Sequence, residues 1–103
     1  MVLSIQNQKI EINLNQHGEL VEPRLSNLLE IVDGTKEIHV NVLDTDPISG
    51  GIFVNVAKLI NYGDHVKVIK KYGSLLGKIE IEETYRNIKP SEVLKMLFPN
   101  TFK

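Results

Sequence analysis

Apolar and polar residues alternate along four stretches of the chain, which is the pattern of a β-strand with one buried face. The alternation covers residues 10–15, 38–42, 66–68 and 79–82. A parallel sheet covered on both faces would instead have continuous apolar runs. Residues 2–5 can pair with the first stretch as a hairpin. The alternation therefore predicts a sheet of four to five strands that is covered on one face only.

Three other segments have apolar residues three and four positions apart, which is the pattern of an amphipathic helix. They are residues 23–33, 51–62 and 90–98. Proline lies in the first turn of the first and third segments, and glycine follows the first and second, as is typical of helix ends. We therefore expect three helices, the second of them between two strands.

The order of these elements predicts the architecture. Right-handed strand–helix–strand crossovers would place the helices on the same side of the sheet. The chain has 103 residues, close to the commonest size of a single domain, and no linker or repeat divides it. The sequence thus predicts one α/β domain over residues 1–103, in two layers, with a mixed four- to five-stranded sheet and helices on one face.

The composition excludes several kinds of site. The chain contains no cysteine, which excludes disulfides, thiolate metal ligands and a cysteine nucleophile. Its net charge of −1 at pH 7 argues against a dedicated nucleic-acid or membrane binder, which usually has a basic face. No stretch resembles a signal peptide or reaches the roughly 20 apolar residues of a membrane helix. We therefore expect a cytoplasmic protein with no membrane partner.

Side chains that could support catalysis or bind a metal are scattered along the sequence. His17 and His65 lie in expected turns, and His39 lies on the polar face of an expected strand. Asp44 and Asp46 are close together, but a metal site needs three or four converging ligands. No serine lies in a nucleophile motif. We expect no catalytic residues, no metal and no cofactor, and only a deep pocket that encloses these aspartates and a histidine would indicate an enzyme.

The segment that follows the strand at residues 38–42 is the strongest candidate for a binding site. In open α/β sheets, ligands tend to bind at the carboxyl ends of strands, and a helix that begins at residue 51 would offer free N–H groups to an anion. The simpler alternative is an ordinary turn in which Ser49 caps that helix. The expected partner-binding residues are Asp44, Asp46, Ser49, Gly50, Gly51 and Phe53.

The order of elements resembles that of a STAS domain, the fold of anti-sigma-factor antagonists and of sulfate-transporter tails. Gly18-Glu19-Leu20 occupies the place of the family's Gly-Glu-Leu turn before its first helix. Residues 46–51 occupy the place of its Asp-Ser-Ser-Gly loop. The resemblance covers roughly residues 2–70 and implies a STAS-like fold.

This resemblance also implies a partner, an anti-sigma or kinase-like protein that phosphorylates a serine in the loop. When Ser49-Gly50 is aligned with the family's last Ser-Gly, Pro47 takes the place of the aspartate and Ile48 that of the phosphoserine. Ser49 is then the candidate phosphorylation site. The helix that the family has between its last two strands is missing, and we expect a hairpin around residues 72–77.

The leading hypothesis is therefore a small non-enzymatic protein-interaction or regulatory module, either a monomer or a weak homodimer. The C-terminal helix packs on the sheet or docks a partner or second copy. The alternative is a small nucleic-acid-binding or phage-type accessory protein that uses a basic hairpin over residues 67–78. The charged residues of that hairpin are Lys67, Lys70, Lys71 and Lys78, offset by Glu80, Glu82 and Glu83.

Overall fold

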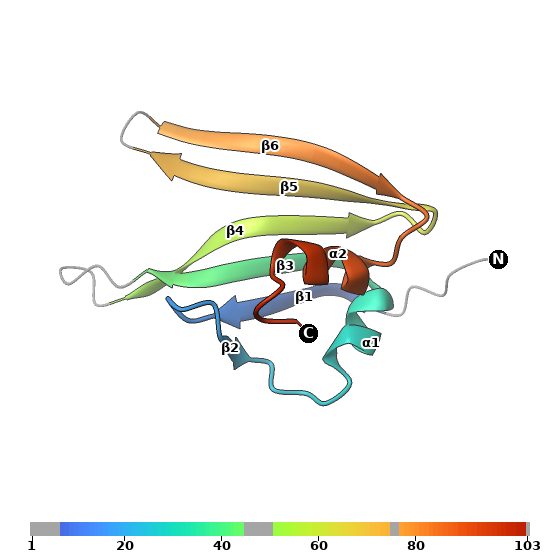
Figure 1. Cartoon of the computed structure of the whole chain (residues 1–103), viewed down its shortest axis with the longest axis horizontal. Helices are drawn as coiled ribbons and strands as arrows, with labels where there is room; N and C mark the ends of the chain where they lie inside the picture. Colours follow the sequence, from blue (N-terminus) through green and yellow to red (C-terminus); the bar gives the residue numbers. More distant parts are fainter. Residues whose placement is uncertain (1–6, 45–50, 75–76, 103) are drawn as a thin grey trace.

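The computed structural model describes residues 7–44, 51–74 and 77–102. In these residues the chain forms six strands and two helices (Figure 1). The elements are β1 (Asn7–Leu14), β2 (Leu20–Glu22), α1 (Leu28–Asp33), β3 (Thr35–Asp44), β4 (Ile52–Asn61), β5 (His65–Ser74), β6 (Gly77–Arg86) and α2 (Pro90–Leu97).

All six strands belong to one mixed sheet, in the order β2-β1-β3-β4-β5-β6. β1 and β3 are parallel, and every other neighbouring pair is antiparallel. The prediction of a four- to five-stranded sheet is therefore wrong. The extra strands come from β2 and from the segment expected to be the second helix, while the expected strand at residues 2–5 lies outside the described residues.

The predicted helix over residues 51–62 is wrong, because these residues form β4. The segment is rich in β-branched and aromatic residues, which favour strands. Its apolar positions mimicked helical spacing because β4 contains a bulge. Val40 lies opposite Ala57 and Asn41 lies opposite Asn55, so Val56 is an extra residue with no partner on β3. A bulge interrupts strict alternation, and short apolar runs of this kind fit both periods.

The other predicted elements agree better with the structure. α2 lies within residues 90–98, and β5 pairs with β6 in the expected hairpin, as far as Ser74 and Gly77. The first helix is confined to Leu28–Asp33, and the short strand β2 lies upstream of it.

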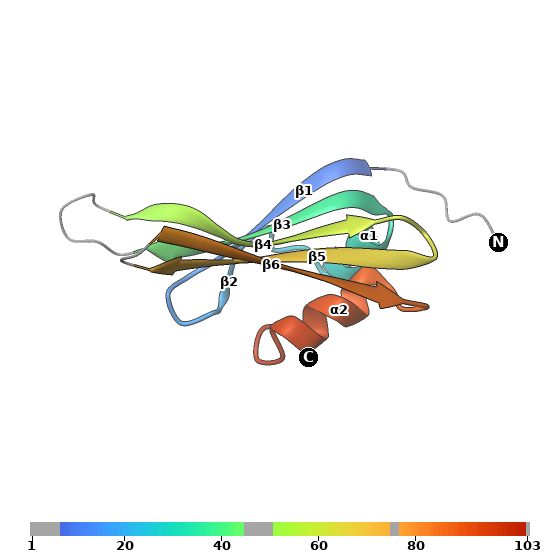
Figure 2. The same cartoon turned by 90° about the horizontal axis from the view of Figure 1, so that it is seen from above.

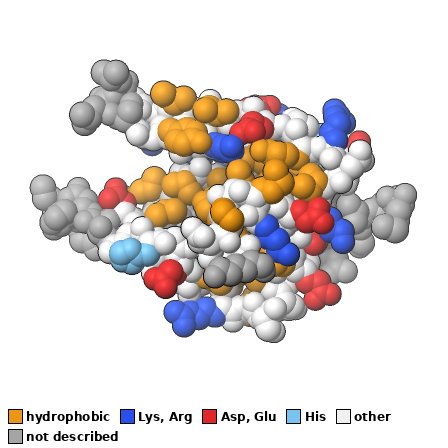
Figure 3. Space-filling model, in the orientation of Figure 1, with side chains coloured by type: hydrophobic (Ala, Val, Ile, Leu, Met, Phe, Trp, Pro, Cys, Tyr) orange, Lys and Arg blue, Asp and Glu red, His pale blue; other side chains and the backbone are white. Residues whose placement is uncertain are grey.

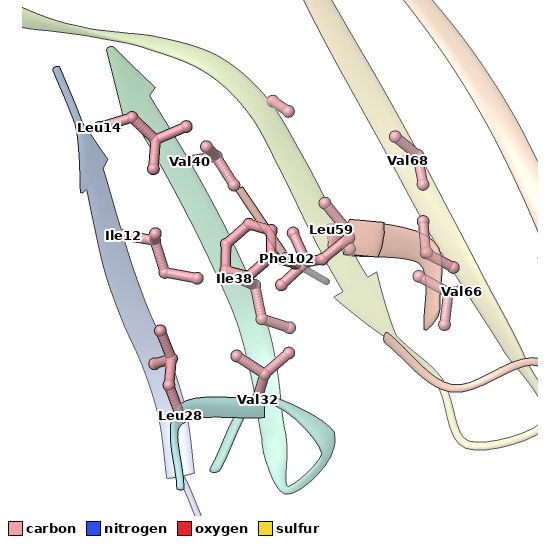
Figure 4. Close-up of a cluster of buried hydrophobic side chains, with 13 residues drawn as sticks. Ile12, Leu14, Leu28, Val32, Ile38, Val40, Leu59, Val66, Val68 and Phe102 are labelled. Atoms are coloured by element: carbon pink, nitrogen blue, oxygen red, sulfur yellow. The ribbon is translucent and has the colours of Figure 1, made fainter. Parts of the chain in front are cut away.

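Both helices contribute to a single hydrophobic core on one side of the sheet, which we call the helix-bearing face (Figure 2). Figure 4 shows this core, with side chains from β1, β3, β4 and β5 meeting those of α1 and the C-terminal Phe102. The fully buried members include Ile12, Val32, Ile38, Val40, Leu59, Val66, Val68, Val93 and Leu94. Each such side chain stabilises the fold by about 1.5–3 kcal/mol relative to exposure. α2 lies over the middle of the sheet and α1 lies at the end where β1 and β3 begin, so the far ends of β4, β5 and β6 extend beyond both helices (Figure 1).

Candidate functional site

The sheet divides between β4 and β5. Pairing between these strands ends at Ala57 and Lys70, although β4 continues to Ile52 and β5 continues to Ser74. Beyond that point β4 remains paired with β3, and β5 remains paired with β6 (Figure 1). We call the gap between residues 52–56 of β4 and residues 71–74 of β5 the fork.

The bulge in β4 accounts for the position of the fork. The unpartnered residue Val56 lies immediately beside Ala57, the last residue of β4 that pairs with β5. A bulge bends its strand and increases the local twist. The far end of β4 therefore follows β3 and leaves the edge of β5 uncovered.

Two hollows border the fork. One has a volume of about 320 Å³, lies between β4, β5 and the end of α2, and is lined by Val56, Ala57, Lys70, Lys71, Tyr72, Leu97 and Phe98. The other has a volume of about 210 Å³ and is lined by residues 54–56 of β4, residues 71–73 of β5, and Lys78 and Glu80 of β6. Val56 and Tyr72 border both hollows, so the two are parts of one site.

Exposed apolar side chains lie beside the fork on the helix-bearing face, on β5 and on its neighbour β6. Tyr72 lies four residues after the buried Val68 and hence on the same face of β5. Ile79 lies opposite Tyr72, and Ile81 lies two residues further along β6. These three side chains are 50%, 57% and 45% exposed. Figure 3 shows hydrophobic side chains gathered on this face of the molecule. Contiguous apolar surface of this kind marks interaction sites.

On the opposite face of the sheet, the fork has a positive border. Lys71 and Lys78 line the hollow there together with Glu80, and in the described part of the chain neither lysine forms an ion pair. Glu80 lies opposite Lys71 across the β5–β6 pair. Two lysines and one glutamate leave this border with a net positive charge.

The four lysines of the expected basic hairpin do not form a single surface. Lys70 lies on the helix-bearing face, where Glu83 accepts from its Nζ at 2.5 Å and raises the pKa of the lysine above its usual value. Lys67 lies on the opposite face and pairs with Glu82 at 2.9 Å. The positive charge that a nucleic-acid phosphate would meet is thus divided between two faces and partly neutralised.

A row of amide side chains crosses the opposite face of the sheet and ends at the fork. The Nδ2 of Asn55 donates to Oδ1 of Asn41 at 3.1 Å, and Asn41 donates to Asn13 at 2.8 Å. Asn13 in turn donates to Glu22 at 2.6 Å. The Oδ1 of Asn55 is buried and accepts no hydrogen bond from the described residues. An unpaired buried acceptor costs about 1–3 kcal/mol, so Asn55, which lines the fork, carries an oxygen whose hydrogen-bonding capacity the described residues leave unused.

The expected binding segment is only partly described. Asp46, Ser49 and Gly50 lie outside the described residues. The expected phosphorylation site, Ser49, is therefore among the residues that the structure does not describe. Asp44 ends β3, and Gly51, at φ +92°, precedes β4. Because a strand begins at Ile52, there is no helix N-terminus there to bind an anion.

Phe53 is the one expected site residue that belongs to a leg of the fork. It lies opposite Leu43 on β3, so its side chain is on the opposite face from Val54 and Tyr72.

The prediction missed the fork residues because β4 was expected to be a helix. The signal that could have found them is the pair of apolar side chains Ile79 and Ile81 in a hairpin with no helix to cover it.

The histidines are in separate places. His39 is partly buried on β3, and burial together with Lys9 and Lys58 lowers its pKa below the usual value. His65 pairs with Asp64 at 2.6 Å and stacks on Tyr62. His17 lies in the turn before β2. In the described ranges, no group of three histidine or acidic side chains is placed to hold a metal ion.

Comparison with protein-family models, with curated proteins and with solved structures finds no match to this chain. These comparisons therefore leave the resemblance to STAS domains untested. Among the residues that the structure describes, no helix is long and apolar enough to cross a membrane.

Proposed function

We propose that this protein is a non-enzymatic protein-interaction module that binds a partner protein at the fork. The observation that carries the proposal is the exposed apolar surface beside an opening in the sheet. Tyr72, Ile79 and Ile81 are each about half exposed there, although they lie on the same face as the core. Burial of such side chains against a partner is the main favourable contribution to protein association.

The chemistry of the fork favours a protein partner over a nucleic acid. Bases stack on aromatic side chains in an aligned, positively charged groove. The fork has a single exposed tyrosine, and Lys67 and Lys70 are already paired with glutamates. The resemblance to STAS domains implies that the partner is an anti-sigma or kinase-like protein. This identity of the partner stays a prediction.

The proposed binding surface is formed by the far ends of β4 and β5, and not by the expected segment that follows β3. Two segments distant in the sequence form it, with Val56 on one side and Tyr72 on the other. Leu97 of α2 and Phe98, the C-cap residue that follows it, line the inner end of the fork. This arrangement gives the C-terminal helix a part in binding as well as in packing.

Selection of random twelve-residue peptides displayed on phage, with the whole protein as bait, tests the proposal. We expect selected peptides to bind the parent and to bind Tyr72→Asp at least about tenfold more weakly, because a central aromatic residue usually dominates an interface. Leu25→Asp is the matched control, since Leu25 is also about half exposed but precedes α1. Failure to select any peptide, or equal binding to Tyr72→Asp, would contradict the proposal.

A further inference from the structure

We infer that the fork binds its partner as an added β-strand, a segment of four to five residues in which apolar residues alternate with acidic ones. This inference rests on the proposed function and specifies the partner's conformation and chemistry. Three observations support it: the unpaired strand edges, the different surroundings on the two faces, and the unpaired amide oxygen of Asn55.

Both sides of the fork are strand edges. Residues 52–55 of β4 pair with β3, residues 71–74 of β5 pair with β6, and no register pair joins the two legs. Alternate backbone N–H and C=O groups of a strand point to each side, so each leg directs part of its groups into the fork. Such edges bind extended peptides by strand addition, in which main-chain hydrogen bonds supply affinity.

The length of the legs limits the length of the segment. The β4 leg has five residues and the β5 leg has four. At about 3.4 Å per residue, the legs extend roughly 14–17 Å, which matches an inserted segment of four to five residues.

The two faces of the fork specify the side chains of the segment. Residues of an inserted strand point alternately to the two faces. Those on the helix-bearing face would contact Val54, Val56 and Tyr72, so they should be apolar. Those on the opposite face would contact Lys71 and Lys78, so they should be acidic.

The amide of Asn55 supplies an independent reason for a backbone partner. The Nδ2 of Asn55 already donates hydrogen bonds to Val40 O, Asn41 Oδ1 and Ala57 O, at 3.1–3.2 Å. Its buried Oδ1 accepts no hydrogen bond from the described residues. Asn55 lines the hollow on the opposite face. An N–H of the inserted segment would provide the missing donor, which an apolar ligand could not do.

The decisive experiment uses a capped eight-residue peptide in which isoleucine alternates with glutamate, labelled at one end, and the whole protein. Fluorescence anisotropy measures the dissociation constant. One matched peptide carries N-methyl groups on alternate backbone amides, and another carries lysine in place of each glutamate. We expect N-methylation to weaken binding by about tenfold or more, because it removes the backbone donors. Replacement of glutamate by lysine should weaken it about tenfold.

A protein variant with reversed charge completes the test. The double variant Lys71→Glu with Lys78→Glu should prefer the lysine peptide over the glutamate peptide, which reverses the preference of the parent. Lys89→Glu is the control, because Lys89 is an exposed lysine at the start of α2, away from the fork. A second readout is amide hydrogen exchange measured by NMR. We expect the exchange of residues 71–74 with solvent to slow when the peptide binds.

The outcomes separate this inference from the proposed function. If the N-methylated peptide binds as tightly as its parent, or the lysine peptide binds as tightly as the glutamate peptide, strand addition is overturned. Peptides selected on phage that still depend on Tyr72 would then leave the proposed function standing. β6 itself contains Ile79-Glu80-Ile81-Glu82, which has the same alternation. Sedimentation could also show that the protein dimerises and that Tyr72→Asp abolishes the dimer. That result would assign the fork to a second copy of this chain and overturn the inference that a separate partner binds there.

Discussion

The carboxylate of Asp33, the last residue of α1, accepts two hydrogen bonds from Ser91 in the first turn of α2. The backbone N of Ser91 donates to Oδ1 and its hydroxyl donates to Oδ2, both at 2.9 Å. Lys89, the N-cap residue of α2, forms no side-chain cap. Asp33 thus satisfies an N–H group of the helix start from 58 residues away and places its negative charge where the helix dipole favours it.

The first prediction concerns the stability that this contact provides. Asp33→Ala should lower the free energy of unfolding by about 1–3 kcal/mol, because it leaves the N–H of the mostly buried Ser91 without an acceptor. Ser91→Ala should cost less, about 0.5–1.5 kcal/mol, because the backbone hydrogen bond remains. Urea denaturation followed by circular dichroism measures both. Equal losses in the two variants would contradict the assignment of the larger effect to the backbone N–H.

A second prediction follows from the partly buried His39. Its pKa is lowered by burial and by Lys9 and Lys58, so the native state binds a proton less readily than the unfolded chain. Stability attributable to the neutral imidazole is present above the usual pKa of 6.5 and is lost as the pH falls below it. His39→Gln should therefore show a smaller decrease in unfolding free energy between pH 7 and pH 5 than the parent. An NMR titration in which His39 protonates above pH 6.5 would contradict this.

A third prediction concerns Glu83 at the inner end of the β5–β6 hairpin. Hydrogen bonds from Lys70 and from the hydroxyl of Tyr85 hold the pKa of Glu83 below its usual value of 4.5. The stabilisation by this carboxylate is present above pH 4.5 and is lost as the pH falls through the lower native value. Glu83→Gln should remove part of the acid sensitivity of the thermal unfolding temperature below pH 4.5. The effect is small because the pair is partly exposed, and 1 M salt should reduce it further.

A fourth prediction concerns the fork in the unliganded protein. Amides of residues 71–74 that face the fork should exchange with solvent faster than those of residues 66–69, which lie between two paired strands. Deletion of Val56 removes the bulge and restores strict alternation along β4, so β4 can stay beside β5. Hydrogen exchange measured by NMR should then slow at residues 71–74, and binding of the isoleucine–glutamate peptide should be lost. Unchanged exchange in a folded deletion variant would show that the bulge does not open the sheet.

Local periodicity was sufficient to predict β1, β3, β5, β6 and α2. The alternation of Ile38, Val40 and Val42 with polar residues indicated a strand with one buried face, and burial alternates as expected from Ile38 to Asn41, whereas Val42 is only partly buried. Such signals lie within a few neighbouring residues, so they survive without any knowledge of the fold. The absence of cysteine likewise excluded thiolate chemistry from the sequence alone.

Only the tertiary structure decided the state of residues 51–62 and, with it, the candidate site. The apolar residues from Ile52 to Ile60 fit a helix and a bulged strand equally well, and pairing with β3 selected the strand. The fork arises from two pairings, β3–β4 and β5–β6, that diverge at Val56, and no local pattern encodes that divergence. What the sequence by itself determined is which residues alternate. Which neighbours complete each strand depends on contacts between distant segments, because a strand edge has no local partner for its hydrogen bonds.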